Sequence, residues 1–281
     1  MRDSLGDRIK ENYENRTRYL LPRRTYTIIR LDGKSFHNYT SKMDRPFDKA
    51  FIHVMDGTAK LLCENIQGAQ FAYVQSDEIS ILLTDFEKPT TQVFFDGNIQ
   101  KICSVTASMT TAYFNVNVTK FFMLSIPNNF PKTQAMFDSR VFTIPDPIEV
   151  YNYFVWRQKD ATRNAINSVA QALYSHKELH GKSSSEQQEM IFQKGQNFND
   201  YPDGCKRGRF IKQEIYTYDA QFVEELGSLG DPTKRTEISE SVVRHRWFVM
   251  EPPIFTKDPK FLKDLIPTIP QFEEIGGDVN V

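Results

Sequence analysis

The sequence predicts an α+β fold in which an antiparallel sheet carries helices packed on one face. Two observations indicate this fold: apolar residues repeat at strand or helix spacing in the order β-α-β-β-α-β, and turn residues separate the repeats. This is the order of the split βαβ motif, which sets the first strand beside a hairpin made by the next two strands. The second half of the chain is predicted to be mainly helical and extended.

The first elements of this motif begin near the N-terminus. A helix is expected over residues 5–20, and an apolar, β-rich strand follows over Thr25–Leu31. From Asp48 onwards, apolar residues repeat at helical spacing, and Gly68 ends this repeat. These residues therefore predict a strand followed by a helix with one buried face.

The next two strands form a hairpin in this interpretation. Apolar residues alternate over residues 71–75 and again over residues 79–83, as expected for strands. A tight turn at Ser76 and Asp77 would join the two strands. The acidic pair formed by Asp77 and Glu78 would then lie at the tip of the hairpin.

The remaining elements are predicted from similar patterns. A helix is expected over about residues 97–115, and further strands over residues 121–126 and 141–144. Asp146 precedes a proline and predicts the N-cap of a long helix. Several prolines after residue 244 predict a largely extended tail as far as residue 269.

Composition excludes several classes of protein. A chain of 281 residues with 40% hydrophobic residues can bury a substantial core without disulfides. Cys63, Cys103 and Cys205 form no Cys-x-x-Cys pair, and the charged N-terminus lacks an apolar signal core, so we expect a reducing, cytoplasmic environment. No apolar stretch approaches the roughly 20 residues that span a bilayer.

The net charge of −1 argues against binding nucleic acid through overall charge alone, but local basic patches remain. They lie at residues 16–24, 206–212 and 244–246. The last patch is followed by Trp247, which leaves base stacking and core packing equally open for this side chain. Trp156 is expected to pack rather than to stack.

Two acidic segments are candidates for a magnesium site. Asp32 and Gly33 follow the first strand, and Asp77 and Glu78 lie at the hairpin tip. Each pair alone is typical of a turn. Two Mg²⁺ ions about 3.5–4 Å apart, however, need acidic oxygens from neighbouring strands for phosphoryl chemistry. The split motif would bring Asp32 and Asp77 together.

The sequence resembles the tRNA-His guanylyltransferase superfamily, and within it the branch of tRNA-His guanylyltransferase-like proteins. The order and spacing of several segments together carry this resemblance, which covers most of the chain. The segments are Arg30–His37, Tyr73–Glu78, Lys101 with Thr106–Ser108, Phe137–Arg140, Trp156–Asp160 and Lys206–Gly208.

The resemblance implies an enzyme with a polymerase-like palm that adds nucleotides to the 5′ end of tRNA in the 3′-to-5′ direction. ATP would activate a 5′-monophosphate, and the 3′-hydroxyl of an incoming nucleoside triphosphate such as GTP would then attack it. Residues 1–145 would form the palm-like catalytic domain with its N-terminal helix. Residues 146–281 would form a C-terminal region for RNA binding and oligomerisation, in a homotetramer.

The resemblance also implies roles for single residues. The catalytic residues would be Asp32, Asp77 and Glu78, and two Mg²⁺ ions would be bound by Asp32, the carbonyl of Gly33, and Asp77. The nucleotide-binding residues would be Lys34, Ser35, Phe36 and His37, through their backbone amides, with Arg45, Ser76 and Lys101. The RNA-binding residues would be Arg157, Arg163, Asn164, Lys206, Arg207 and Arg209.

One departure from the superfamily bears on specificity. Thr162 occupies the position of the histidine in the His-Ile-Asn-Asn segment of enzymes dedicated to tRNA-His. We therefore expect template-dependent repair of 5′-truncated tRNAs. The alternatives are a tRNA-His guanylyltransferase that adds a single G, a palm-type nucleotidyl cyclase that needs no RNA, and a catalytically silent RNA-binding protein.

Overall fold

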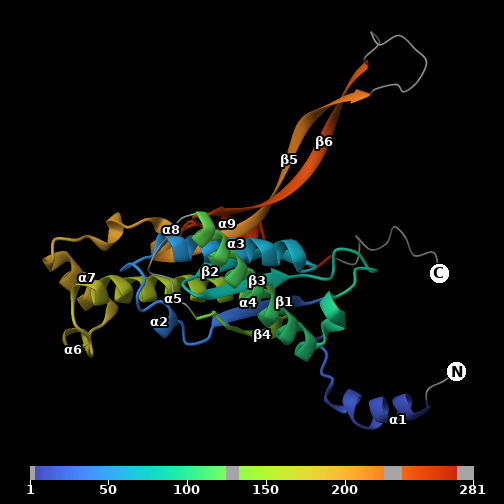
Figure 1. Ribbon diagram of the computed structural model, residues 1–281, viewed down its shortest axis with the longest axis horizontal. Coiled ribbons are helices and arrows are strands. Elements are labelled where there is room, and N and C mark those ends of the chain that lie inside the picture. Colours follow the sequence, from blue (N-terminus) through green and yellow to red (C-terminus); the bar gives the residue numbers. More distant parts are fainter. Residues whose placement is uncertain (1–3, 125–132, 225–235, 271–281) are drawn as a thin grey trace.

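The computed structural model describes residues 4–124, 133–224 and 236–270. The described residues form α-helices and β-strands, with three short 3-10 turns (Figure 1). In chain order the elements are α1 (Ser4–Asn12), η1 (Glu14–Thr17), β1 (Tyr26–Gly33), α2 (Phe36–Tyr39), α3 (Lys49–Asn65), β2 (Ala69–Gln75), β3 (Glu78–Leu83), η2 (Phe94–Gly97), α4 (Ile99–Leu124), β4 (Phe137–Ile144), α5 (Pro147–Leu173), α6 (His176–Leu179), α7 (Ser184–Gln193), η3 (Phe198–Asp200), α8 (Asp203–Arg207), β5 (Arg209–Glu224), β6 (Thr236–Met250) and α9 (Pro259–Lys263).

The described strands form one antiparallel sheet in the order β4-β1-β3-β2-β5-β6. Strand β1 pairs with β3, and β2 and β3 form the predicted hairpin. Gln75 pairs with Glu78, so Ser76 and Asp77 make a two-residue turn. Ser76 has a positive φ of 46°, which is typical of tight hairpin turns. The α+β class and the order of the split motif are confirmed.

Helices cover both faces of this sheet. Helices α3 and α4 pack against one face, where β1 contributes Ile29 and Leu31 to the core. Helix α5 and the segment around α9 pack against the other face, where β1 contributes Tyr26 and Ile28. The expectation that α3 and α4 share one face is confirmed. The second face is covered by residues that follow Asp146.

Strands from the C-terminal half extend the same sheet. Strand β5 pairs with β2, with Tyr73 opposite Phe210. Beyond this point β5 and β6 pair with each other and form a long ribbon that projects from the body (Figure 1). The sequence analysis missed this ribbon. The tail after residue 244 begins as strand β6, as expected for an extended segment, but it also contains the short helix α9.

Local signals fix the starts of two helices. Asp48 caps α3, where its Oδ1 accepts a hydrogen bond from the Phe51 amide at 2.8 Å. Asp146 caps α5 by accepting from the Ile148 amide at 2.7 Å. Gly68 has a φ of +82°, and a Cβ there would lie only 2.6 Å from a backbone oxygen. Glycine is therefore required where the chain turns into β2.

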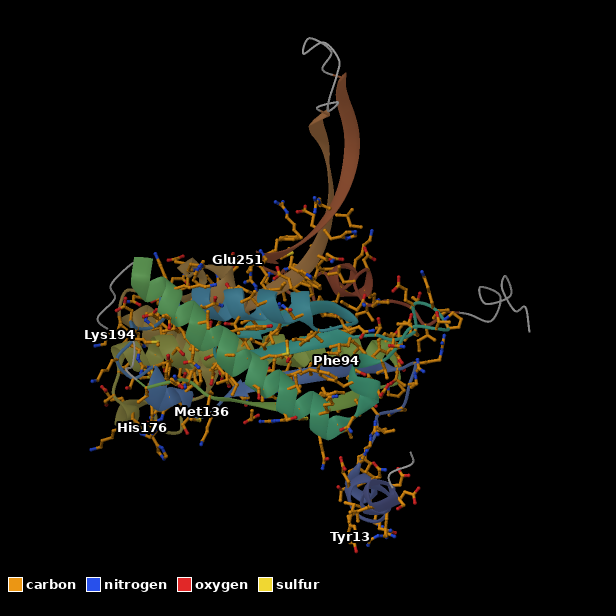
Figure 2. The ribbon with its side chains drawn as sticks, turned by 45° about the vertical axis from the view of Figure 1, so that its right-hand side comes forward. Tyr13, Phe94, Met136, His176, Lys194 and Glu251 are labelled. Atoms are coloured by element: carbon orange, nitrogen blue, oxygen red, sulfur yellow. The ribbon has the colours of Figure 1, made fainter. Side chains whose placement is uncertain are left out.

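Two predicted elements differ from the structure. The helix expected over residues 5–20 ends at Asn12, and Figures 1 and 2 show α1 set apart from the body. It buries none of its residues, so packing against the body does not stabilise it. The strand expected over residues 121–126 is also wrong as far as Leu124, because α4 continues through it; the last two residues lie outside the described part. Extending an existing helix costs less than starting a new strand.

A helix of the length and apolarity needed to cross a membrane is not found in the described residues. Two helices exceed 25 residues, α4 and α5, and both belong to the layers that pack against the sheet. Their length therefore serves the core of this fold.

Candidate active site

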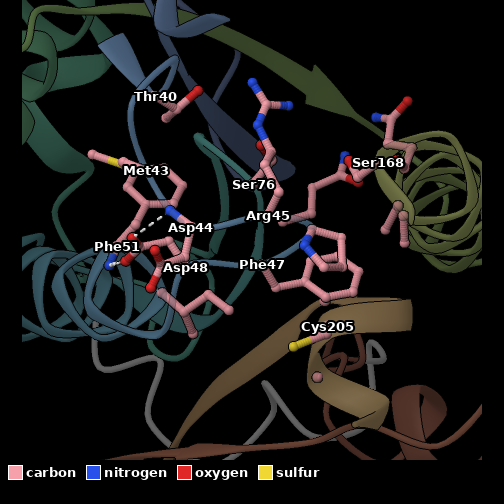
Figure 3. Close-up of a pocket in the computed structure, with 18 of the residues that line it drawn as sticks. Thr40, Met43, Asp44, Arg45, Phe47, Asp48, Phe51, Ser76, Ser168 and Cys205 are labelled. Atoms are coloured by element: carbon pink, nitrogen blue, oxygen red, sulfur yellow. Dashed lines mark hydrogen bonds between the residues drawn. The ribbon is translucent and has the colours of Figure 1, made fainter. Parts of the chain in front are cut away.

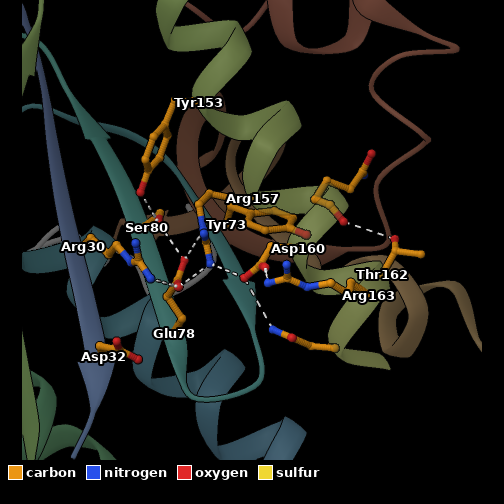
Figure 4. Close-up of polar contacts among 12 residues, drawn as sticks. Arg30, Asp32, Tyr73, Glu78, Ser80, Tyr153, Arg157, Asp160, Thr162 and Arg163 are labelled. Carbon is orange, nitrogen blue, oxygen red and sulfur yellow. Dashed lines mark hydrogen bonds and ion pairs between the residues drawn. The ribbon is translucent and has the colours of Figure 1, made fainter. Parts of the chain in front are cut away.

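The acidic residues of two distant segments meet at one end of the sheet. Asp32 lies near the end of β1, and Asp77 lies in the turn between β2 and β3. Leu31 pairs with Ile79, which brings the end of β1 beside this turn. Asp32, Asp77 and Glu78 line one cavity of about 360 Å³. Figure 4 shows Asp32 and Glu78 on their neighbouring strands, so the expected approach of the two segments is confirmed.

The carboxylates in this cavity are only partly compensated by nearby cations. Burial, together with the negative charges of Asp32 and Glu78, raises the pKa of Asp77 to about 6. Hydrogen bonds from Ser76 and from the backbone act in the opposite direction. Asp32 has Arg140 nearby, with Nη2 3.3 Å from its Oδ2, in a half-exposed pair. The excess of negative charge favours binding of a cation.

The donors in this cavity suit Mg²⁺. This ion is bound through one or two carboxylates and keeps several waters or phosphate oxygens. Asp32 and Asp77 supply carboxylates, and the carbonyl of Gly33 follows Asp32 in the chain. A Cβ at Gly33 would clash with the Phe36 ring, so this position has no room for a side chain. Among the described residues, no group of three or more His, Cys, Asp or Glu could hold a metal ion. An ion held by two carboxylates and one carbonyl would keep outside ligands.

Glu78 is held by two arginines. Its Oε1 accepts from Arg157 Nε at 2.7 Å, and its Oε2 lies 2.6 Å from Arg157 Nη2 and 2.7 Å from Arg30 Nη2 (Figure 4). Asp160 also accepts from Arg157, at 2.8 Å. These groups are largely buried, and the two-point contact fixes the carboxylate in one orientation. Glu78 therefore holds the hairpin against α5 beside the acidic cavity.

Three residues expected to contact RNA, Arg157, Lys206 and Arg209, are buried and paired within the chain. The Arg157 side chain is only 3% exposed and forms an ion pair with Glu78. Lys206 Nζ donates to the Asn199 carbonyl at 2.6 Å. Arg209 Nε donates to an Asp56 carboxylate oxygen at 2.7 Å. A buried cation needs such partners. Each of the three nevertheless lines a cavity, Arg209 one of about 160 Å³, Lys206 one of about 350 Å³ and Arg157 the acidic one.

Two other residues of that group, Arg163 and Asn164, are exposed, and the Arg207 side chain is 17% exposed. The Arg163 side chain is 68% exposed and pairs with Asp160. Asn164 is also exposed and lines the acidic cavity. Arg207 pairs with Asp203, and it lines a separate cavity of about 350 Å³ on another side of α5. Of these three residues, Arg163 and Asn164 lie beside the acidic residues.

A second cavity adjoins the acidic one (Figure 3). It measures about 160 Å³, and Arg45 and residues of the 40–52 segment form much of its wall. Ser76, Gln75 and Asn164 line both cavities, so the two spaces are neighbours. Arg45 and Ser76, two residues expected to bind a nucleotide, are thus brought together beside Asp77.

The backbone amides expected to bind phosphate lie directly after β1. The Lys34 amide donates to the Met136 carbonyl at 2.8 Å, so it is already satisfied. Ser35 adopts a left-handed conformation with a φ of +57°. Phe36 is buried in an aromatic cluster, while His37 is exposed. The Lys34 amide, the first of the four amides expected to bind phosphate, is therefore not free in this structure.

Lys101 is not brought to the acidic residues within one chain. It lies in the first turn of α4, with Nζ 4.8 Å from the centroid of the Phe95 ring. It lines neither the acidic cavity nor its neighbour. The adjacent Ile102 lies near Thr27, at the opposite end of β1 from Asp32. The structure thus separates Lys101 from the other residues assigned to the nucleotide.

Sequence reasoning assigned no role to two residues of the charged network, Arg30 and Asp160. Arg30 interrupts an apolar strand two residues before Asp32, and side chains two apart on a strand share one face. Asp160 lies one helical turn after Arg157. A charge inside a buried strand was the signal available for Arg30.

The two tryptophans have opposite environments. Trp247 is only 9% exposed and packs in the core beside α3 and α4. Trp156 is 52% exposed on α5. The structure therefore decides the open question on Trp247 in favour of packing. It corrects the expectation for Trp156, which lies at the surface.

Comparison with known proteins gives consistent results. A family model described as tRNAHis guanylyltransferase matches residues 6–145. The tRNA(His) guanylyltransferase of Schizosaccharomyces pombe is 30% identical over 233 residues, which cover 75% of this chain and 84% of that protein. The match therefore extends well beyond the span of the family model.

Solved structures with the same fold include a bacterial tRNA(HIS) guanylyltransferase (Thg1)-like protein in complex with ATP, with a TM-score of 0.77 and 39% identity. The same kind of protein in complex with GTP gives a TM-score of 0.73 and 38% identity. Each alignment covers 94% of this chain and 99% of the solved chain. The similarity thus includes the C-terminal half of the fold.

Proposed function

We propose a specific reaction for this chain on one premise: it belongs to the tRNAHis guanylyltransferase family and is a nucleotidyltransferase. The reaction is template-dependent addition of nucleotides to the 5′ end of a truncated tRNA, in the 3′-to-5′ direction. The 5′-monophosphate of the RNA first attacks the α-phosphorus of ATP, which forms an adenylylated 5′ end and releases pyrophosphate. The 3′-hydroxyl of an incoming nucleoside triphosphate then attacks the activated phosphorus in line and displaces AMP.

The observation that carries this proposal is the meeting of Asp32 and Asp77 in one cavity that adjoins a second cavity lined by Arg45. We assign the reacting phosphates to the first cavity and the nucleoside triphosphate to the side of the second, where Arg45 supplies a cation. The related bacterial proteins of known structure are complexes with ATP and with GTP, which supports nucleotides as the substrates here.

The protein mainly positions groups and balances charge in this mechanism. Asp32, Asp77 and the Gly33 carbonyl would hold Mg²⁺, which when bound neutralises phosphate charge and activates the attacking hydroxyl. Arg45 and Arg140 are exposed cations beside the two cavities, and we assign them to the phosphate groups. Ser76 lines both cavities and would align the nucleotide between them.

In this proposal Glu78 is a positioning residue that does not contact the substrate or the metal. Its carboxylate already accepts from Arg30 and Arg157, so it is not available as a further metal ligand. It ties the hairpin tip to α5 and thereby fixes Asp77 opposite Asp32. Loss of Glu78 would impair the reaction by displacing the turn.

One residue, Thr162, favours template-dependent repair over addition of a single G to tRNA-His. Thr162 lies on α5 and its hydroxyl bonds back to the Gln158 carbonyl at 3.1 Å. The position therefore offers no imidazole to an RNA. The single-G activity stays as the second candidate, because the S. pombe relative is a tRNA(His) guanylyltransferase.

The oligomer is proposed to be a homotetramer. Residues 1–145 would form the palm-like catalytic part, and residues 146–281 would add RNA binding and subunit contacts. Size-exclusion chromatography with light scattering tests this assembly, and a monomer at all concentrations would contradict it.

The decisive experiment uses purified protein, Mg²⁺, ATP, all four nucleoside triphosphates, and a 5′-monophosphorylated tRNA that lacks its first nucleotide. Two such tRNAs, with C or A opposite the missing position, should gain G and U respectively. Addition of G alone to full-length tRNA-His would support the second candidate. A cyclic nucleotide formed without RNA would indicate a cyclase, and RNA binding without addition would indicate a silent binding protein.

A further inference from the structure

We propose that Trp156 is a stacking platform for the terminal base at the 5′ end of the RNA substrate. The proposal rests on the proposed function, because it assigns a contact to the RNA that the acidic cavity would act on. It concerns a side chain to which the reaction above gives no role.

Three side chains contact the indole of Trp156. Arg157 Cζ lies 4.3 Å from the ring centroid, and Arg30 Cζ lies 5.8 Å from it. Both guanidinium groups contact the same Oε2 of Glu78, so they approach the indole together. Tyr153 adds an edge-on contact at 5.8 Å. The ring is therefore fixed by buried neighbours, yet it remains 52% exposed.

A fixed aromatic ring with an exposed surface is suited to stacking on a nucleic acid base. Base stacking on aromatic side chains is tolerant of sequence, because every base has a π-face. It also loses little entropy when the ring is already ordered. A platform of this kind would accept any 5′-terminal base, as an end-repair enzyme requires.

The position of Trp156 directs the stacked base toward the reaction site. Arg30 and Arg157, which contact the indole, also line the cavity that contains Asp32 and Asp77. A base on the indole would therefore place its 5′-phosphate at the edge of this cavity.

The surroundings of Trp156 favour RNA over a protein partner. Residues 160, 163, 164 and 167 lie on the same face of α5 as Trp156, by helical spacing. They are polar or charged, and Arg163 is an exposed cation that can meet a phosphate. On the other side of Trp156 the same spacing places Ile148, an exposed apolar residue two turns away at the start of α5. A protein-docking surface would instead be expected to continue as an apolar patch. A single exposed indole beside cations matches the chemistry of a nucleotide.

The test measures equilibrium binding of two 5′-phosphorylated acceptor-stem RNA hairpins, one with a normal 5′-terminal base and one abasic at that position. We expect the parent to bind the normal hairpin about tenfold more tightly. Trp156→Ala should remove this preference, and Trp156→Phe should keep part of it. Phe192→Ala is the matched control, because Phe192 is a similarly exposed aromatic on α7 and should leave the preference unchanged.

Fluorescence gives an independent measurement, because the chain has two tryptophans and Trp247 is buried. The normal hairpin should quench the parent strongly, and it should quench Trp156→Phe only weakly. An unchanged preference for the normal base in Trp156→Ala, or equal quenching of both proteins, would overturn the proposal.

The two proposals fail in different ways. A Trp156-dependent preference in a protein that adds no nucleotide would overturn the proposed function alone. Normal addition with no role for Trp156 would overturn this inference alone. GTP binding should be the same in the parent and in every variant, which reports that the fold and the nucleotide site are intact.

Discussion

The two faces of the central strands bury different kinds of side chain. The face covered by α3 and α4 is built from apolar strand residues, among them Ile29, Leu31, Val74, Ile79 and Ile81. Its buried threonines on the helices bond back to helix carbonyls. The face covered by α5 is apolar at one end only. Its other end buries the charged network of Arg30, Glu78 and Arg157, next to the acidic cavity.

The two faces of one sheet thus separate stability from chemistry. An apolar face needs only complementary volume, and it can be repacked at modest cost. A buried charge needs a specific partner in a specific place. The network on the α5 face therefore constrains the position of the hairpin tip, and with it the distance between Asp32 and Asp77.

The largest effect is expected from removing charge in the acidic cavity. Asp77→Asn should lower nucleotide addition by about 10³-fold, because a preorganised charge at the reacting phosphates is lost. The fold should persist, since Asn has nearly the same shape. Single-turnover assays with circular dichroism measure both properties. An active Asp77→Asn enzyme would break the assignment of this face to chemistry.

A smaller but still large effect is expected from breaking the charged network. Arg157→Met should lower the free energy of unfolding by about 3–5 kcal/mol, because Glu78 loses its two-point partner while staying buried. Arg163→Met is the matched control on the same helix. Its pair is exposed, so we expect a change of about 0–1 kcal/mol. Urea denaturation measures both variants, and equal losses would contradict the contrast between buried and exposed pairs.

A substitution on the apolar face should lower the stability of the protein and leave its activity unchanged. Ile81 is fully buried there, and Ile81→Ala should cost about 2–5 kcal/mol through lost burial and the cavity left behind. Activity per folded molecule should stay within about twofold of the parent, because no charge near the cavity is altered. Thermal unfolding and active-site titration test this pair of expectations. A selective loss of activity would show that the two faces are coupled.

The pH dependence of stability sharpens the comparison further. The pKa of Asp77 is about 6 in the folded chain against an ordinary value of 3.8, so the folded state binds this proton more tightly. In metal-free buffer, the free energy of unfolding should fall as pH rises from about 4 to about 6. The fall is on the order of 2–3 kcal/mol, and it levels off at higher pH.

Asp77→Asn should abolish this fall, so the stability of the variant relative to the parent should increase with pH. Urea denaturation at a series of pH values with a chelator present measures it. If the free energies of unfolding of the two proteins changed with pH in parallel, the raised pKa of Asp77 would not be the cause of the fall.

Much of the local structure follows from the sequence alone. The alternation around residues 71–83 fixes the hairpin and leaves Asp77 at its tip. Asp48 and Asp146 mark helix starts, because each cap is a bond to an amide only two or three residues away. Strand order then predicts that Asp32 and Asp77 approach. These features depend on periodicity and on short-range bonds, which a sequence displays directly.

Only the tertiary structure decides which side chains are buried. Arg157 and Arg163 are both arginines on one helix, yet one is enclosed and the other exposed. Trp156 and Trp247 differ in the same way, opposite to the expectation for Trp156. The reason is that burial depends on partners far along the chain: Arg157 is enclosed by Glu78, which is 79 residues away. No local pattern encodes such a contact, and it exists only once the sheet and α5 have packed.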